Sequence, residues 1–200
     1  RRQRQMCIRD RSLLLSQLSL RPAHREHLRS PKRGLSNEQI DALGFKSTPP
    51  PFLCRSITDR LIKQGCKVQG VPGFYRDDNG HWTMAFYKKT AGILIPAIGF
   101  DGRIQGFQIM LDVPLKNKDD PPEKTGAKYI WFSSSSKRDG AGSGSPVHLV
   151  GDSSARVVYV IEGLLKADIS HCLTGRTFVA IAGANNTCLL YTSDAADDLT

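Results

Sequence analysis

The stretch VVYVIEGLLKAD, residues Val157–Asp168, decides the predicted fold of the last third of the chain. A run of β-branched and aromatic residues leads into Glu162-Gly163, and a helical pattern follows at once. Such a continuous apolar run is typical of a strand that is buried on both faces of a parallel sheet. TFVAIAGANN, residues 177–186, predicts a second strand of this kind. The two strands and the intervening helix predict a β-α-β unit, the start of an α/β domain.

Glu162 is the first candidate for a functional side chain. Ligands of open parallel sheets bind beyond the carboxyl ends of the strands, where Glu162 is expected to lie. Gly163 leaves room for a phosphate at the start of the helix. A carboxylate in this place can hold a divalent metal or act as a general acid or base. The alternative is a solvated glutamate that merely caps the helix, and the pattern alone does not separate the two.

The chain before this unit divides into a helical and an antiparallel part. Residues 12–70 predict a helical element. In LSNEQIDALG, Ser36 is expected to cap a helix in a capping box with Gln39, and in SITDRLIKQG, Ser56 is the expected cap. Residues 71–150 predict a small antiparallel sheet. The predicted fold class is therefore α+β followed by α/β.

The antiparallel part is predicted from turn signals. GFYRDDNGHWTMAFY has Asn79-Gly80 between aromatic-rich arms, which is a strong hairpin signal. GILIPAIGFDGRIQGFQIMLD predicts two strands that turn at Asp101-Gly102, and KYIWF predicts a further strand. SSSSKRDGAGSGSP, residues 133–146, is interpreted as a flexible linker.

The two ends of the chain are interpreted as foreign to the fold. Residues 1–11 begin with RRQRQMCIRD and residues 188–200 begin with CLLYTSDAADD. One short DNA sequence encodes the first of these segments, and its complementary strand encodes the second almost completely. They resemble a translated sequencing adapter, so we expect these ends to carry no structure. The natural part would then be a truncated fragment, about Ser12 to Thr187.

The charge of the chain favours a polyanionic partner. The two ends hold five of the 28 basic and four of the 19 acidic residues, so an excess of eight positive charges remains between them. Single-stranded DNA is the expected partner. The candidate phosphate contacts are two pairs, Lys88 with Lys89 and Lys137 with Arg138, although such pairs are often merely solvated turns. The interleaved aromatics could stack on bases, but we favour core packing for most of Phe74, Tyr75, Trp82, Phe86 and Tyr87.

Cysteine and histidine patterns indicate no zinc site. Cys54, Cys66 and Cys172 have no CxxC spacing, which favours reduced thiols and a cytoplasmic location. His148 and His171 have no partner at metal-ligand spacing, so we expect a surface or packing role for both. No apolar run reaches the ~20 residues that a membrane span needs, so no membrane partner is expected.

These segments resemble a known family. VVYVIEGLLKADI and the following VAIAGANN are similar to the opening of a Toprim domain, the nucleotidyl-transfer and nuclease module of bacterial primases and topoisomerases. GILIPAIGFDGRIQGFQIMLD followed by KYIWF resembles the catalytic core of a DnaG-type primase, and RGLSNEQIDALGF resembles the helical element that opens this core. The strongest likeness is to uncharacterised Toprim-like replication proteins of plasmids, phages and integrative elements. It implies that residues 151–187 begin a Rossmann-like Toprim domain.

The resemblance assigns expected roles to individual residues. It implies that Glu162 is the catalytic or Mg²⁺-binding carboxylate, and it makes phosphate or nucleotide contacts of Gly163, Lys166, Arg103 and Lys128. Three positions depart from the primase pattern. Met110 stands where primases carry an arginine, Lys166 stands where they carry an aspartate, and Asp168 follows two residues late, where it would point elsewhere on the helix. These departures argue against primer synthesis more than against the binding of nucleic acid or nucleotides.

Three functions stay open on the sequence. The first is Mg²⁺-dependent, primase-like nucleotidyl transfer in the replication of a mobile element, with a helicase domain or partner. The second is a Toprim-like module that binds nucleic acid without catalysis, and the third is a Toprim nuclease. The second acidic cluster of a Toprim site would lie past Asn186. We therefore expect the given chain to have no metal-dependent activity of its own.

Overall fold

A computed structural model describes the backbone of residues 8–116, 121 and 123–182, and the side chains from residue 11 onward. The helices are α1 (Ile8–Ser16), α2 (Pro22–Arg29), α3 (Asn37–Ala42), α4 (Cys54–Lys63) and α5 (Leu164–Thr174), with 3-10 turns η1 (Pro51–Leu53) and η2 (Lys88–Thr90). The strands are β1 (Lys46–Ser47), β2 (Phe74–Arg76), β3 (Trp82–Met84), β4 (Gly92–Ile98), β5 (Ile104–Leu115), β6 (Ala127–Trp131), β7 (His148–Val150), β8 (Val158–Glu162) and β9 (Thr177–Ile181).

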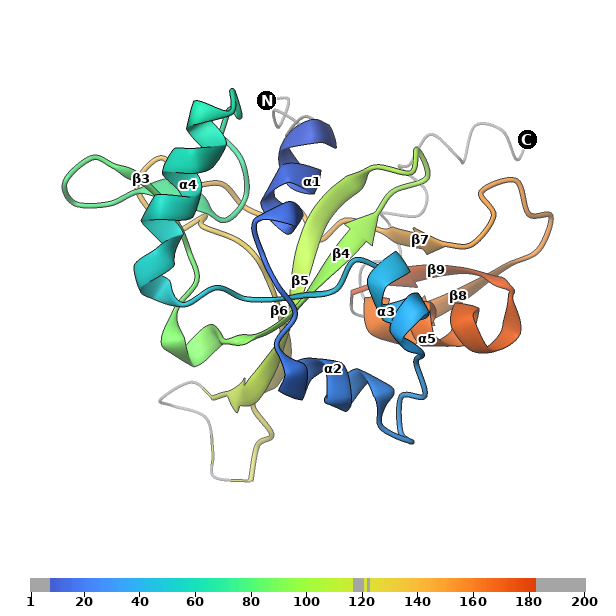
Figure 1. Ribbon diagram of the computed structural model, residues 1–200. Coiled ribbons are helices and arrows are strands. Elements are labelled where there is room, and N and C mark those ends of the chain that lie inside the picture. Colours follow the sequence, from blue (N-terminus) through green and yellow to red (C-terminus); the bar gives the residue numbers. More distant parts are fainter. Residues whose placement is uncertain (1–7, 117–120, 122, 183–200) are drawn as a thin grey trace.

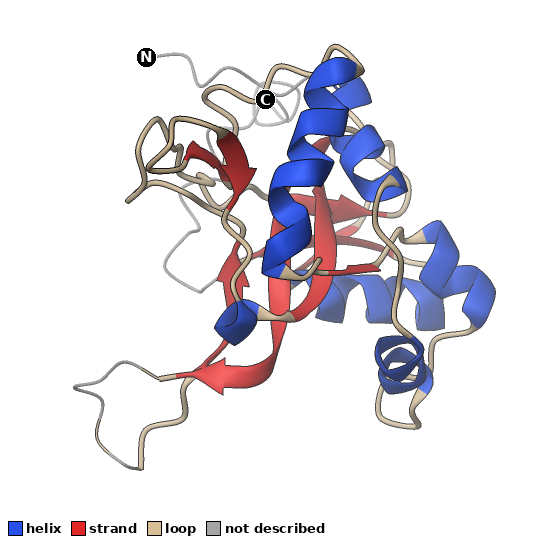
Figure 2. Cartoon of the chain, turned by 60° about the vertical axis from the view of Figure 1, so that its left-hand side comes forward, coloured by secondary structure: helices blue, strands red, loops and turns tan. Residues whose placement is uncertain are grey.

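An antiparallel sheet of four strands, in the order β1-β4-β5-β6, forms the middle of the molecule (Figures 1 and 2). Its centre is the long β4–β5 pair, which runs from Gly92 opposite Leu111 to Ile98 opposite Ile104. The chain turns between them at Asp101-Gly102, as predicted. The β2–β3 hairpin is also antiparallel and contains Asn79-Gly80 in its loop. The predicted antiparallel part of the fold is confirmed.

The last third of the chain forms a mixed sheet of three strands in the order β7-β9-β8. β8 and β9 are parallel, from Val158 opposite Thr177 to Glu162 opposite Ile181, and α5 connects them. The predicted β-α-β unit is therefore present. β7 pairs with β9 in the antiparallel sense and was not predicted.

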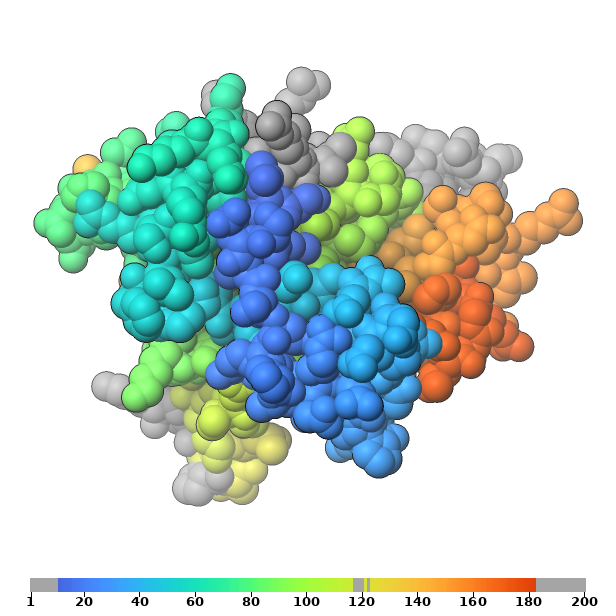
Figure 3. Space-filling model, viewed as in Figure 1, coloured from blue at the N-terminus to red at the C-terminus, as the bar shows by residue number. Residues whose placement is uncertain are grey.

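Two hydrophobic clusters lie on opposite faces of the four-stranded sheet. Alternate residues of β4 point into different clusters, Leu94 into the one and Ile93 and Ile95 into the other. The first cluster includes buried residues of α4 and the β2–β3 hairpin, and the second includes residues of α2, α3, α5 and β9. The N-terminal helices make up much of the near face in Figure 3. Both faces of the central sheet are therefore covered.

One of the two predicted helix caps is found where the sequence places it. Ser36 caps α3, and its side chain and that of Gln39 form the predicted capping box. The prediction for Ser56 was wrong, because α4 begins two residues earlier, at Cys54, and the Ser56 hydroxyl bonds back to the carbonyl of Leu53. The proline turn η1 leads directly into α4, so that no separate cap is needed.

The boundary expected after residue 11 falls inside α1. Arg11 is buried, and its guanidinium donates to the carbonyl of Ile104. Our expectation that residues 1–11 carry no structure is therefore wrong for residues 8–11. The other expected foreign end, residues 188–200, lies outside the described residues.

Two further predictions from the sequence were wrong. β8 is the edge strand of its sheet, and Val157 and Val160 are 65% and 60% exposed, so the apolar run is not buried on both faces. Residues 133–146 were interpreted as a flexible linker, but Ser134 is buried and its hydroxyl donates to the carbonyl of Phe74 over 2.7 Å. The amide of Ser134 also donates to the carbonyl of Ala141, so this segment closes a compact loop against the hairpin.

Among the helices of the described residues, none is long and apolar enough to cross a membrane.

Candidate functional site

The end of β8 brings three of the predicted site residues together. Glu162 is the last residue of β8, and its side chain is exposed. Gly163 follows with a φ of 94°, a conformation that favours glycine, and its amide donates to the carbonyl of Ile181 on β9. The exposed Lys166 bends back toward this turn, because its Cδ lies 3.9 Å from the position of a Cβ at Gly163. A carboxylate and an ammonium group therefore flank an open backbone turn.

Glu162 offers a carboxylate of the kind that Mg²⁺ prefers, since this ion takes oxygen ligands and is usually held through one or two carboxylates. Among the residues that the structure describes, no group of three histidine, cysteine or acidic side chains could hold a metal ion. Glu162 is thus one carboxylate that could hold Mg²⁺, and it is not part of a larger cluster of such side chains within the described residues.

A pocket of about 480 Å³ lies beside Lys128, between α2 and the strands β4 to β6. Arg21, His24 and His27 contribute to its wall from α2 and the residue before it, and Met110 and Asp112 contribute from β5. Lys128 was predicted to contact phosphate. The three groups from the region of α2 were not predicted, because nothing in their local pattern distinguishes them from an ordinary solvated helix face.

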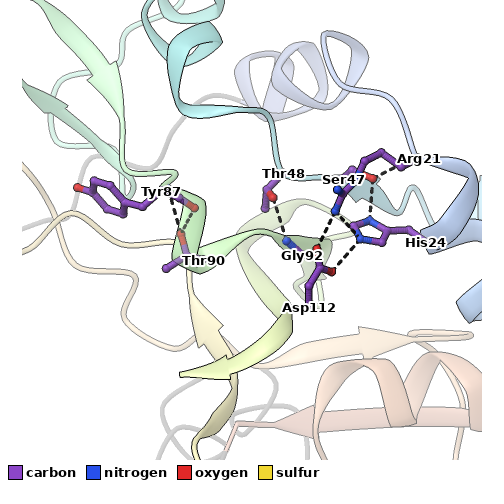
Figure 4. Close-up of polar contacts among 8 residues, drawn as sticks. All are labelled: Arg21, His24, Ser47, Thr48, Tyr87, Thr90, Gly92 and Asp112. Carbon is purple, nitrogen blue, oxygen red and sulfur yellow. Dashed lines mark hydrogen bonds and ion pairs between the residues drawn. The ribbon is translucent and has the colours of Figure 1, made fainter. Parts of the chain in front are cut away.

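A hydrogen-bonded network forms one wall of this pocket (Figure 4). The carboxylate of Asp112 accepts from the guanidinium of Arg21 and contacts His24 Nε2, both over 2.8 Å. His24 Nδ1 lies 2.8 Å from the hydroxyl of Ser47. His24 Nε2 also lies 2.6 Å from the guanidinium of Arg21, which can only donate, so this nitrogen faces both a donor and the carboxylate acceptor of Asp112. The network fixes α2 against β1 and β5.

The order Ser47, His24, Asp112 resembles a nucleophilic triad, but the geometry does not support this chemistry. A nucleophilic hydroxyl must reach the substrate. Ser47 is buried, and its hydroxyl also accepts the backbone amide of Arg21 over 2.8 Å. It is not part of the pocket wall. Ser47 therefore holds the imidazole in place and is no nucleophile.

Burial and neighbouring charges shift the pKa values of both histidines of the pocket. Burial lowers the pKa of His24, while the charge of Asp112 opposes this shift. Partial burial and then the charges of Arg33 and Lys128 lower the pKa of His27. Arg33 also reaches the sulfur of Met110, with its guanidinium nitrogen 3.7 Å from Sδ. A guanidinium from a different part of the chain thus contacts the side chain of Met110.

A second group of cations lies on and beside the β2–β3 hairpin. Lys137 Nζ lies 5.7 Å from the ring centroid of Tyr75 and 5.6 Å from that of Tyr87, within the range of cation–π attraction. Burial, and then the neighbouring Tyr87, raises the pKa of Tyr75 to about 12, so its phenol stays neutral. Arg76 covers the ring of Trp82 at 5.0 Å.

The other predicted cations lie near this group or apart from it. Lys88 directly follows Tyr87 in η2, with Lys89 next to it, and both are exposed. The carbonyl of Arg138 accepts the amide of Arg76 over 2.9 Å. Phe74 and Phe86 are buried, as expected for core packing. Arg103 lies on the β4–β5 turn, where the carboxylate of Asp101, 3.5 Å away, partly neutralises it.

One buried polar pair was missed entirely. His148 Nε2 lies 3.0 Å from a carboxylate oxygen of Asp168, and both side chains are buried. The expectation that Asp168 points away from the strand end was correct, but its partner was not foreseen. The other histidine, His171, donates from Nδ1 to the carbonyl of Arg176 over 2.8 Å, which agrees with a packing role.

The overall arrangement of these elements is shared with solved primase structures. The RNA polymerase domain of Mycobacterium tuberculosis primase DnaG, in complex with a double-stranded DNA oligomer with a 6-nucleotide overhang, has a TM-score of 0.59 and 19% identity, over 88% of this chain and 54% of that chain. The fold is that of a DnaG-type primase core. The predicted likeness of the fold to a primase core is thereby confirmed.

Two more primases show the same fold. The zinc-binding and RNA polymerase domains of Aquifex aeolicus primase have a TM-score of 0.59 at 16% identity, over 88% of this chain and 41% of that chain. The Escherichia coli primase catalytic core has a TM-score of 0.50 at 22% identity, over 88% and 55%. The chain thus spans about half, or less, of the primase chains that it matches. No family model matches the sequence, and no curated protein matches it.

Proposed function

We propose that this chain is part of a primase-like protein that binds single-stranded nucleic acid during DNA replication, in the context of a plasmid, phage or integrative element. The observation that carries the proposal is the positively charged pocket beside Lys128 on the central sheet of a primase-core fold. Arg21 and Lys128 line it, and the charge of Arg33 acts on His27 in its wall, which suits the phosphates of a polynucleotide or a nucleotide.

The β-α-β unit would be the start of a Toprim domain that carries the chemistry. Glu162 would accept or donate a proton at the reacting hydroxyl or contribute one carboxylate to bound Mg²⁺, whose chemistry would be the stabilisation of charge on the transferred phosphoryl group. Lys166 would neutralise a phosphate oxygen at the open turn of Gly163. The described residues contribute one carboxylate, so catalysis is proposed for the longer protein and not for this chain.

A module that binds nucleic acid without catalysis is the second candidate. The departures from the primase pattern at Met110 and Lys166 favour it. Both candidates require the same binding surface, so binding is the property to test first. A Toprim nuclease would use Glu162 in the same way, and no observation on this chain favours it over nucleotidyl transfer.

The test is the salt dependence of binding to a fluorescent oligothymidylate, measured by anisotropy. Each phosphate contact that is lost should reduce the log–log slope by about 0.7 for a single strand. We expect Lys128→Ala and Lys137→Ala to weaken binding and to lower this slope.

The matched control is Lys63→Ala, which removes a lysine of equal charge from the last turn of α4. This variant should bind as the unchanged chain does. Binding that does not depend on salt, no binding at low salt, or an equal loss in all three variants would contradict the proposed surface.

A further inference from the structure

The buried pair His148–Asp168 connects three elements. The backbone amide of Ile98, the last residue of β4, donates to His148 Nδ1 over 2.9 Å. His148, the first residue of β7, contacts Asp168 on α5 through Nε2 over 3.0 Å. The side chains of His148 and Asp168 are 3% and 2% exposed. A chain of two hydrogen bonds therefore runs from the central sheet to α5.

The direction of both bonds is fixed by elementary chemistry. A backbone amide can only donate, so Nδ1 of His148 must carry a lone pair. The neutral ring then has its proton on Nε2, which donates to the carboxylate of Asp168. A proton on Nδ1 would face the amide proton of Ile98 at the 2.9 Å between the two nitrogens. The imidazole is therefore held as the neutral Nε2–H tautomer.

The pair connects the β4–β5 turn with the end of β8, which both carry predicted site residues. Ile98 leads into the turn that carries Arg103, and α5 begins after Glu162-Gly163 and carries Lys166 two residues before Asp168. The packing around the pair is apolar, with Ala97, Leu164 and Leu165 in the same cluster. Apolar contacts are not directional, so they do not fix the rotation of a helix as hydrogen bonds do.

Stability alone does not account for a polar pair in this place. A buried ion pair or polar pair can often be replaced by apolar residues of similar volume without loss of stability. Asp168 also faces His148 in the core, so it cannot reach a substrate. Its position suggests a role in holding other residues.

We propose that His148 and Asp168 are positioning residues that fix α5, and with it Glu162, Gly163 and Lys166, on the central sheet. The role of the strand end in phosphate binding rests on the proposed function. The fixing of α5 by the pair does not depend on the proposed function, because it concerns contacts within the chain.

The test compares Asp168→Ala with Asp168→Asn in the full 200-residue chain. Asparagine keeps an oxygen that accepts from Nε2 and removes the charge, whereas alanine removes the acceptor. The first readout is hydrogen exchange at the Ile98 amide and within α5, together with the ¹⁵N shifts of the His148 ring. The second is the binding of inorganic pyrophosphate, with Lys166→Ala to show that the probe binds at the strand end.

We expect Asp168→Ala to accelerate exchange at Ile98 and in the first turns of α5 by on the order of five- to tenfold, the equivalent of one ordinary hydrogen bond. It should weaken pyrophosphate binding about fivefold or more, while Asp168→Asn restores both properties. The same loss with asparagine as with alanine would overturn the proposal, because the charge and not the hydrogen bond would then matter.

Two other results are also decisive. If Asp168→Ala lowers the melting temperature but leaves exchange in α5 and pyrophosphate binding unchanged, the pair is a core contact and the proposal is wrong. If the unchanged chain does not bind pyrophosphate, the phosphate site of the proposed function fails. The exchange experiment and the tautomer of His148 then still decide whether the pair positions α5.

Discussion

At the scale of single residues, His24 shows how a functional group can be held by its neighbours. It is buried between Ser47 and Asp112, beside Arg21 and His27, and burial is the main cause of its lowered pKa. In the unfolded chain a histidine regains its ordinary pKa of about 6.5. Between that value and the lower pKa of the folded state, the unfolded chain therefore binds more protons.

This difference predicts how the stability of the chain depends on pH. The contribution of His24 to the free energy of unfolding is complete above pH 6.5 and is lost as the pH falls through its lowered folded pKa. His27 acts in the same direction. We expect His24→Gln to make the loss of stability on acidification shallower, as measured by urea unfolding at a series of pH values. His81→Gln, in the exposed hairpin loop, is the control, and an unchanged slope in His24→Gln would contradict the assignment.

Two glycines with nearly the same positive φ allow steric cost to be separated from backbone strain. Gly65 and Gly73 have φ values of 88° and 87°. A Cβ at Gly65 would meet nothing within 4 Å, whereas one at Gly73 would lie 2.2 Å from the ring of Phe132. This ring cannot move aside easily, because it stacks on Phe86 with centroids 4.3 Å apart.

Alanine should therefore have different effects at the two positions. We expect Gly65→Ala to cost roughly 1–2 kcal/mol, the strain of a left-handed alanine. Gly73→Ala should cost about 1–3 kcal/mol more, because it also overpacks the core. Chemical denaturation of both variants measures the difference. Equal losses would show that the Phe132 ring adapts without cost.

At the scale of elements, β8 exposes a hydrogen-bonding edge together with apolar side chains. It pairs with β9 on one side, and within the described residues its other side has no neighbouring strand. Exposed apolar edges of this kind pair readily with other chains. We expect the chain to self-associate at high concentration, and Val160→Lys to reduce this association in sedimentation experiments. Leu173→Lys changes an apolar residue of α5 that is 70% exposed and should leave it unchanged. An equal reduction of self-association in both variants would show that lower surface hydrophobicity, and not the edge of β8, is responsible.

The same strand shows what the sequence could and could not predict about elements. The apolar run before Glu162 correctly predicted a strand, because β-branched residues favour extended backbone. Whether such a strand is central or at an edge depends on which strands pair beside it, and the run itself carries no information about this. β7 was missed because three residues are too few to show a period. The segment 133–146 was misread because its small polar residues bond to the hairpin, which a composition suited to linkers does not reveal.

At the scale of the whole molecule, the candidate contacts with nucleic acid lie in separate places on one fold. Lys137 lies in the loop that packs against the hairpin, Lys128 at the pocket beside α2, and Glu162 at the end of β8. The sequence predicted these three residues from charge pairs, from a strand end and from a family likeness. It could not predict Arg21 or Arg33, whose contacts cross 91 and 77 positions of the chain. Long-range pairing of this kind follows from the packing of the sheet, which local patterns do not specify.

The central strand β4 has a further consequence for how the sheet finds its alignment. Polarity normally prevents a strand from slipping by one residue, because a slip would expose apolar side chains to water. Both faces of β4 are covered by hydrophobic clusters, so a slip by one residue would only exchange aliphatic side chains between the two clusters. Gly92 removes this ambiguity, because a Cβ there would lie 2.0 Å from the carbonyl oxygen of Met110. Only a residue without a side chain fits at this contact, so a single alignment of β4 on β5 is possible. The aliphatic positions beside Gly92 are not needed to set the alignment and are therefore free to vary in evolution.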